Sequence, residues 1–182
     1  MSRPGLLIAS PQMRDSNFAG TVVLLWHFDE QGASGVVINR ALDLSLGEIG
    51  EQIDIAPESV VDADQPDRVL WGGPVEPGAG FLVLRGGLPE DEGWNLPNDI
   101  GITTSQTWLE RLLTGGGTYT LCLGYAGWAP GQLDREIETG SWLYTEASPD
   151  LVFEAALGER YDRALAALGL VQSMVWMSPI DE

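Results

Sequence analysis

Apolar residues along this chain form short runs in some segments and helical spacings in others. The segment Thr21–Phe28 is apolar and β-branched, residues 29–32 are typical of a turn, and Val36–Ile38 resumes the apolar run, which predicts a β-hairpin. Further strands are predicted over residues 5–9, 69–71, 80–84, 118–123 and 171–177.

Helical spacing of apolar residues predicts four helices. The first follows Ser45, and the second ends at Gly115–Gly117, where glycine favours termination. The third is short and acidic, with Pro130 predicted at its first position, where a missing N–H costs nothing. The fourth is predicted to begin with Ser148 as its cap and to end at Gly169.

Two polar connections, residues 56–67 and 86–99, separate these elements. Strands and helices follow one another without regular βα alternation, so the pattern predicts an α+β fold rather than a doubly wound sheet. The chain has 182 residues and 44% hydrophobic residues, which suits one domain over 1–182 with a substantial core.

The stretch 124–142 concentrates glycine, proline and tryptophan around a short helix. One interpretation is a strand–turn–helix corner in which Trp128 is packed in the core. The other is a binding site to which Tyr125, Trp128, Gln132 and Glu136 contribute. Both interpretations fit the composition, because glycine and aromatic residues serve packing at corners and recognition at binding sites.

The same stretch resembles the signature of the YqgE/AlgH family of small bacterial proteins. Three other segments agree with that family in the same order: residues 5–15 followed by Phe18, residues 32–40, and residues 71–75. The resemblance covers nearly the whole chain. It implies a mixed, strongly bent sheet forming a pseudo-barrel with helices packed outside, in a family that is biochemically uncharacterised. One branch of that family is named as a transcriptional regulator of alginate synthesis.

The sequence departs from the family pattern at several positions. Ser16 and Ala41 stand where relatives usually have proline, and Ser34 stands where an aliphatic residue or Met is common. A histidine is frequent in relatives at the position of Phe28, whereas here the histidine is its neighbour, His27. This shift argues against assigning His27 a catalytic role by resemblance; on an alternating strand we expect its side chain to point away from both neighbours.

The net charge of the chain limits the kinds of partner that it can bind. The formal net charge is −18, and the nine basic residues are all arginines scattered along the sequence. Such a field repels phosphate backbones and anionic lipid surfaces, so we expect neither direct nucleic-acid binding nor membrane binding. The acidity serves solubility or forms an acidic docking surface.

Further features favour the cytoplasm. No signal peptide is recognised, and no segment approaches the roughly 20 apolar residues that span a bilayer. The single cysteine, Cys122, lies in an apolar strand and is predicted to be a buried, reduced thiol.

Missing residue types exclude several chemistries. Without lysine the chain has no Schiff-base nucleophile and no Walker A phosphate loop. One histidine and one cysteine are too few for a zinc site of nitrogen and sulfur ligands. We therefore predict no metal and no cofactor.

Several polar constellations remain as candidates. Asn39 and Arg40 close a strand among glycines and suit an anion contact, or a structural ion pair. Gly72 and Gly73 offer uncovered backbone N–H groups for an anion, or form a tight turn. Glu136, four residues after Gln132, suits acid–base chemistry, or lies on a solvated helix surface. The predicted ligand contacts are Asn39, Arg40, Gly72, Gly73, Tyr125, Trp128, Gln132 and Glu136.

Three functional hypotheses follow. The first is a non-enzymatic cytoplasmic module that binds a small ligand or a protein partner, in a regulatory role. The second is an enzyme that acts on a small polar substrate through Asn39, Arg40 and Glu136; no catalytic residue is otherwise indicated. The third is transcriptional regulation, which rests on the family resemblance alone.

Overall fold

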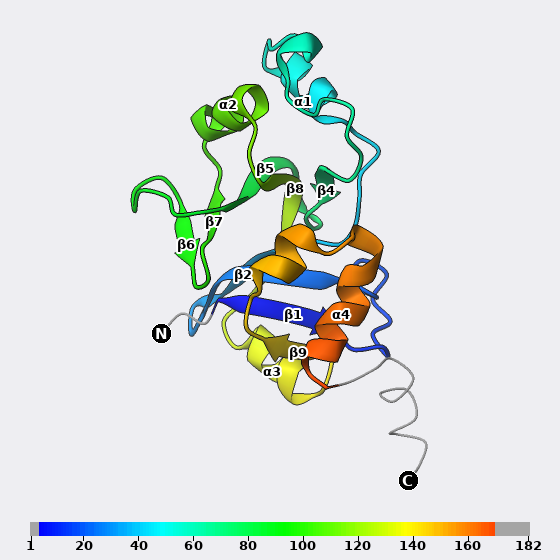
Figure 1. Ribbon diagram of the computed structural model, residues 1–182. Coiled ribbons are helices and arrows are strands. Elements are labelled where there is room, and N and C mark those ends of the chain that lie inside the picture. Colours follow the sequence, from blue (N-terminus) through cyan, green and yellow to red (C-terminus); the bar gives the residue numbers. More distant parts are fainter. Residues whose placement is uncertain (1–3, 170–182) are drawn as a thin grey trace.

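The computed structural model describes residues 4–169 and is built on one curled sheet (Figure 1). The strands of this part of the chain are β1 (Gly5–Ala9), β2 (Val22–Asp29), β3 (Gly32–Val37), β4 (Val69–Trp71), β5 (Val75–Arg85), β6 (Trp94–Leu96), β7 (Ile100–Thr103), β8 (Tyr119–Trp128) and β9 (Trp142–Thr145). Their spatial order is β6-β7-β5-β8-β3-β2-β1-β9, and β4 pairs with β8. Within the described residues, only the β4–β8 pairing is parallel.

The helices pack on the outside of this half-barrel (Figure 1). They are α1 (Leu46–Gln52), η1 (Pro57–Ser59), α2 (Gln106–Gly115), α3 (Gln132–Glu138), η2 (Asp150–Glu154), η3 (Leu157–Glu159) and α4 (Arg160–Ala167). Figure 1 shows α1 and α2 beside β4 to β8, and α3 and α4 beside β1, β2 and β9. The predicted α+β fold, with a strongly bent sheet and helices outside, is confirmed. No helix of residues 4–169 is long and apolar enough to cross a membrane.

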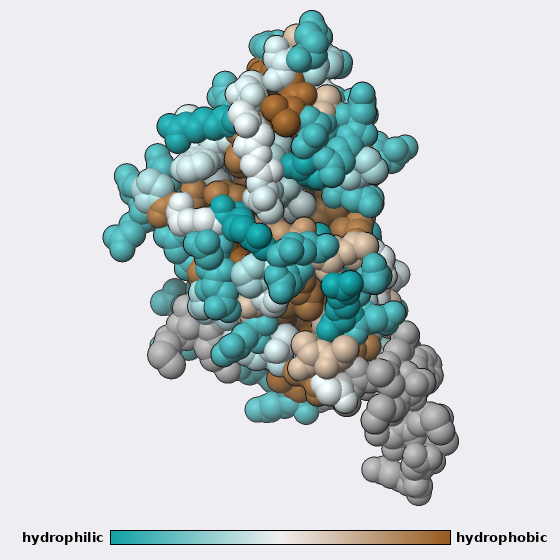
Figure 2. Space-filling model, in the orientation of Figure 1, coloured by the Kyte–Doolittle hydropathy of each residue, from teal (hydrophilic) through white to brown (hydrophobic). Residues whose placement is uncertain are grey.

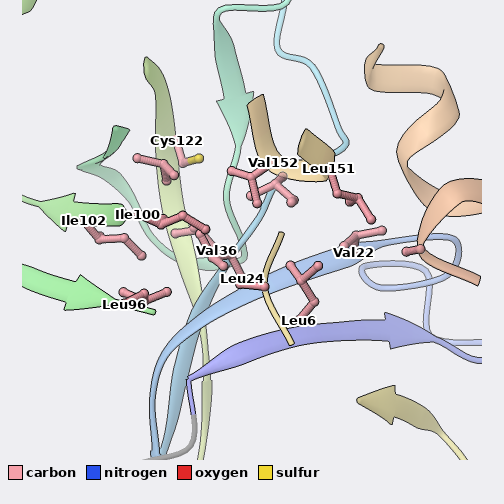
Figure 3. Close-up of a cluster of buried hydrophobic side chains, with 14 of the residues drawn as sticks. Leu6, Val22, Leu24, Val36, Leu96, Ile100, Ile102, Cys122, Leu151 and Val152 are labelled. Carbon is pink, nitrogen blue, oxygen red and sulfur yellow. The ribbon is translucent and has the colours of Figure 1, made fainter. Parts of the chain in front are cut away.

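The strands β1, β2 and β3 are buried on both faces. One face contributes Leu6, Leu24 and Val36 to a cluster completed by residues of β7, η2 and α4 (Figure 3). The other contributes Leu7 and Val23 to a second cluster with the indoles of β8 and β9. Because both faces are covered, the buried parts of these strands, such as Leu6–Ala9 and Val22–Leu25, are apolar without polar alternation. A third cluster lies beneath α1 and α2.

The helices with clear local signals form as predicted. At α1, Ser45 Oγ accepts a hydrogen bond from the Glu48 N–H at 3.0 Å, and the Ser45 N–H donates to Glu48 Oε1 at 3.2 Å. This reciprocal arrangement satisfies two N–H groups that a helix start leaves unpaired. The second helix, α2, ends at Gly116, whose φ of 80° suits glycine.

The strand predicted over 118–123 is longer than expected, because β8 continues through the glycine-rich stretch to Trp128. Its first half pairs with β4 and β5, and its second half pairs with β3 and, at Tyr125, with Val75 at the start of β5. Gly124, with φ of 80°, provides the bend between the two halves. A Cβ on Gly124 would lie 2.3 Å from the Gly73 carbonyl oxygen, so the two backbones approach where only glycine fits.

Two predicted helix starts are wrong. Gly131, in the left-handed region, caps α3, so Pro130 precedes the helix instead of occupying its first position. Ser148 provides no side-chain cap, and the single π-type turn η2 that follows ends at Ala155, whose backbone is extended. Helical structure resumes only at η3 and α4, and Gly169 follows α4 with a positive φ of 76° as predicted.

Three short strands were not predicted. One, β6, lies inside the predicted 86–99 loop, and β7 and β9 have only four residues each. β9 pairs with β1, far away in the sequence, whereas β6 and β7 form a short hairpin with each other and β7 also pairs with β5. The pairing of β9 has no local sequence signal, and β6 and β7 are too short to show a clear strand pattern. The strand predicted over 171–177 lies outside the described residues.

Candidate functional site

The loop of residues 15–20 is held in place by two of the predicted site residues. Asn39 Oδ1 accepts from the Val22 N–H at 2.8 Å, and its Nδ2 donates to the Gly20 carbonyl at 2.9 Å. Arg40 donates from Nη1 to the Asn17 carbonyl at 2.8 Å and from Nη2 to the Ala19 carbonyl at 3.2 Å. Both side chains thus stabilise the backbone of this loop.

Arg40 has an aromatic contact in addition to these carbonyls. Its guanidinium carbon lies 4.8 Å from the ring centroid of Trp71, a cation–π geometry. The structural ion pair considered from the sequence is absent within residues 4–169: Arg40 binds carbonyls and a ring, and no carboxylate of that part of the chain pairs with it.

Glu136 lies at the centre of a polar cluster inside the 124–142 corner. Its Oε1 accepts hydrogen bonds from the indole N–H groups of Trp128, at 3.1 Å, and Trp142, at 3.0 Å. Its Oε2 accepts from Gln132 Nε2 at 2.9 Å, and Gln132 Oε1 accepts from the Ala129 N–H. The solvated helix surface considered for Glu136 is therefore wrong, because the bend after β8 turns this side of α3 towards two buried tryptophans.

Phe18 connects this cluster to the loop that Asn39 and Arg40 hold. Its ring stacks on Trp128 with centroids 6.1 Å apart and meets Trp142 edge-on at 5.5 Å. The structure therefore brings Asn39, Arg40, Trp128, Gln132 and Glu136 to the two sides of one loop. Each of these five side chains makes hydrogen bonds within the chain.

Gly72 and Gly73 serve a close crossing of strands. The Gly72 N–H donates to the Leu123 carbonyl at 2.7 Å, and the Gly72 carbonyl accepts from the Val37 N–H at 2.8 Å. A Cβ on Gly73 would lie 2.2 Å from the Tyr125 carbonyl oxygen. These contacts fit the tight-turn interpretation better than an anion site, because the Gly72 N–H is already bonded within the sheet.

Tyr125 belongs to a separate group of aromatic residues on another face. Trp26 stacks on Phe81 and on Trp94, with centroids 5.1 and 5.3 Å apart, and Tyr125 lies against Trp26 and Phe81 at 6.2 and 5.5 Å. We call Trp26, Phe81, Trp94 and Tyr125 the aromatic platform. Trp94 is 42% exposed, which is unusual for a tryptophan in a stack.

His27 has a local partner at the end of the β2–β3 hairpin. Its Nε2 lies 2.8 Å from Asp29 Oδ2, and both side chains are partly exposed. The Gln31 N–H and then His27 hold the pKa of Asp29 below its usual value. The register of the hairpin shifts just before His27, so Trp26 and Phe28 pack in different clusters; the expectation that they share a side is wrong because of this bulge.

Sequence analysis did not predict a cleft of about 520 Å³ between the 62–68 segment, the start of β8 and the start of α4. Two arginines line it, Arg68 and Arg160. Arg160 is only 5% exposed, although its immediate neighbours Gly158 and Glu159 give no sign of this burial. One signal could have revealed the burial of Arg160. It lies one helical turn before Ala164, so the two side chains share the apolar face of the predicted helix.

The possible metal-ligating side chains of residues 4–169 do not cluster. Within residues 4–169, no group of three or more His, Cys, Asp or Glu side chains is placed to hold a metal ion. Burial raises the pKa of the Cys122 thiol to about 12, so the thiol is protonated and a poor ligand or nucleophile.

Comparisons with known proteins agree with the motifs and the fold. The sequence profile of the AlgH-like family matches residues 6–173. The chain is 40% identical to the UPF0301 protein RSc0675 of Ralstonia nicotianae, covering 93% of this chain and 89% of the relative. It is 37% identical to the UPF0301 protein PBPRA3139 of Photobacterium profundum, covering 90% of each.

Two solved structures share the fold. The solution structure of AlgH from Pseudomonas aeruginosa aligns with a TM-score of 0.78 at 37% identity, covering 94% of this chain and 91% of that one. The crystal structure of DIP2367 from Corynebacterium diphtheriae aligns with a TM-score of 0.73 at 27% identity, covering 92% and 87%. The four ordered motifs, the profile match and the shared half-barrel all agree. The chain therefore belongs to the AlgH-like family.

Proposed function

We propose that this protein is a non-enzymatic, cytoplasmic binding module that docks a partner protein with a basic surface. The observation that carries the proposal is the aromatic platform with the exposed ring of Trp94 at its edge. Tryptophan and tyrosine are enriched at the centres of protein interfaces, because they bury large area at low cost in conformational entropy.

The platform extends onto β5. Val75 pairs with Tyr125 across the β5–β8 ladder, so the two side chains share a face of the sheet, and Val75 is 36% exposed. Glu76 beside it is exposed, and the loop leading into β6 carries Glu90, Asp91 and Glu92, also exposed. In Figure 2, hydrophilic residues cover the edge of the molecule where that loop projects in Figure 1. An apolar centre with an acidic rim suits a basic partner.

The net charge favours the same kind of partner. A charge of −18 attracts cationic surfaces and accelerates their encounter at low ionic strength. The lone, buried cysteine, Cys122, fits the cytoplasmic location, where disulfides are rare.

The two other hypotheses have weaker support. An enzyme using Asn39, Arg40 and Glu136 would need polar groups that are available to a substrate, and these side chains are bonded to the backbone, to indoles and to an amide. Regulation of transcription stays an alternative that rests on the family resemblance alone, and with this net charge it would require a basic partner that contacts DNA.

Affinity capture with matched variants tests the proposal. The intact chain is immobilised and exposed to lysate of its source organism, alongside Trp94→Ala and the control Val61→Ala, which truncates another exposed apolar residue away from the platform. We expect a basic partner to be retained by the parent and the control, released by salt, and lost with Trp94→Ala, which removes about 2 kcal/mol or more at an interface centre. Equal capture by all three proteins contradicts a role for the platform.

A further inference from the structure

The cleft between the 62–68 segment, the start of β8 and the start of α4 differs from the aromatic platform in its chemistry. Its volume is about 520 Å³, the size of a small-molecule site. Arg68 and Arg160 supply positive charge, while Phe153, Leu157 and the ring of Tyr119 supply apolar surface. Figure 1 shows the segment leading into α4 passing below β4 and β8, which places these elements next to one another.

Arg160 is an unusual buried cation. Its Nη1 donates to the Ile38 carbonyl at 2.6 Å and its Nε to the Ala155 carbonyl at 3.1 Å. No carboxylate of residues 4–169 lies within ion-pair distance of it. Burial accordingly lowers its pKa from the usual value. A buried charge normally has an ionic partner, because desolvation without one is costly.

The guanidinium has capacity for such a partner. Arginine carries five N–H donors, and two carbonyls accept from those of Arg160. The remaining donors belong to a side chain that lines the cleft. A planar oxyanion is the ligand that this donor geometry matches, and hydrogen bonds between ionised groups are stronger than neutral ones.

Arg68 adds a second cation at the same cleft. Its guanidinium lies 4.5 Å above the Tyr119 ring, and its Nε donates to the Tyr119 carbonyl at 3.2 Å. Its Nη1 contacts Asp62 Oδ2 at 3.3 Å and Gln65 Oε1 at 3.2 Å. The Asp62 side chain is 52% exposed, so solvent screens this pair.

We propose that the cleft binds a small organic anion through Arg160 and Arg68. The carboxylate or phosphate group of the ligand bonds to the free donors of Arg160 and lies within the field of Arg68. Its apolar body packs against Phe153 and Leu157. This site is independent of the proposed docking of a partner at the aromatic platform.

Acidic groups at the cleft limit its affinity without preventing binding. Asp62 and Asp67 both line it, so the four charged side chains are formally balanced. Asp62 is in contact with Arg68, and Asp67 is exposed, whereas Arg160 is buried. The net charge of −18 acts from farther away, and salt screens it beyond about 8–10 Å at physiological ionic strength.

Titration of the full chain by heteronuclear NMR tests the proposal, with inorganic phosphate in one arm and benzoate in the other. We expect saturable shifts of amides in 117–120 and 155–160, with a Kd of about 1 mM or tighter in at least one arm. Saturation by phosphate alone assigns a phosphorylated ligand, and saturation by benzoate alone assigns a carboxylate. Saturation by both supports a general oxyanion site. No saturable shift in either arm by about 20 mM overturns the proposal.

Three variants locate the binding. Arg160→Gln removes the buried charge and is expected to weaken binding at least about tenfold, as is Arg68→Gln. Arg111→Gln, which removes an exposed arginine on α2, serves as the control and should leave Kd unchanged. Arg160 also anchors α4 to the Ile38 carbonyl, so Arg160→Gln can fail to fold. In that case the Kd of Arg68→Gln alone tests whether the anion binds in the cleft. An unchanged Kd in folded Arg68→Gln, or equal weakening in Arg111→Gln, contradicts the site.

Discussion

Replacing Trp128 by alanine is the sharpest test of how the 124–142 corner works. Trp128 is 7% exposed, stacks on Phe18, meets Trp142 edge-on at 5.9 Å and donates its indole N–H to Glu136. These contacts favour the structural interpretation of the corner over a binding site in which the ring is presented to a ligand. We therefore expect Trp128→Ala to act on stability.

The magnitude follows from the buried area. A tryptophan buries about 150–250 Å², which corresponds to about 4–6 kcal/mol at 25 cal/mol per Å². This is an upper bound, because the unfolded chain already buries part of that surface. Glu136 retains hydrogen bonds from Trp142 and Gln132, so the substitution leaves no unpaired buried carboxylate. The expected loss in the free energy of unfolding is about 3–5 kcal/mol.

Urea denaturation followed by circular dichroism measures this loss. Trp128→Phe retains most of the ring and loses the hydrogen bond to Glu136, so its cost should be about 1–2 kcal/mol. Trp94→Ala, which removes the exposed tryptophan of the platform, should cost less than about 1 kcal/mol. If Trp128→Ala also costs less than about 1 kcal/mol, the packing argument is refuted, and a ligand or partner site at the corner becomes the better interpretation.

Four other predictions concern backbone, hydroxyls, thiol and charge. Gly124→Ala should destabilise the fold by more than about 1 kcal/mol, because Gly124 has a positive φ and its Cβ would meet the Gly73 carbonyl. Gly127→Ala should be near neutral, because Gly127 lies outside the left-handed region and the nearest atom to its Cβ would be 3.6 Å away. Similar denaturation midpoints for the two variants would contradict this prediction. Tyr119→Phe removes a buried hydroxyl that has no hydrogen-bond partner within residues 4–169, and it should be neutral or stabilising. Tyr161→Phe removes the hydrogen bond to the Ala9 carbonyl at 2.6 Å and should cost about 1 kcal/mol in urea unfolding. Cys122 should resist thiol reagents at pH 8 until the chain unfolds, and neither chelator nor reductant should lower Tm by more than about 5 °C. The protein alone should not bind duplex DNA at about 0.15 M salt, and micromolar binding in fluorescence anisotropy would disprove this expectation.

Features with local causes were predictable from the sequence. The capping box at Ser45, the glycine that ends α2 and the β2–β3 hairpin each depend on interactions within a few residues. The strand over residues 69–71 could be recognised from its apolar run, although its partner β8 is distant in the sequence. The ordered motifs indicated the family, and through it the bent sheet. The burial of Cys122 followed from its apolar neighbours.

The site could be predicted only in part. The sequence identified Glu136 and Trp128 as neighbours on a corner, but gave no sign that Trp142 would donate to the same carboxylate. It placed Asn39 and Arg40 together at a strand end, while their partners lie about twenty residues earlier in the loop 17–20. Their hydrogen bonds depend on how β2 and β3 pair.

Tertiary structure alone decided the rest. The strand β8 extends through a glycine-rich stretch because β3, β4 and β5 all pair with it, and β9 is a strand because β1, far away in the sequence, supplies its hydrogen bonds. The burial of Arg160 arises because α4 packs against the end of β3, 122 positions away in sequence. Local hydrogen bonds and steric limits act over a few residues and leave a pattern in the sequence, whereas contacts between distant segments depend on how the whole chain packs.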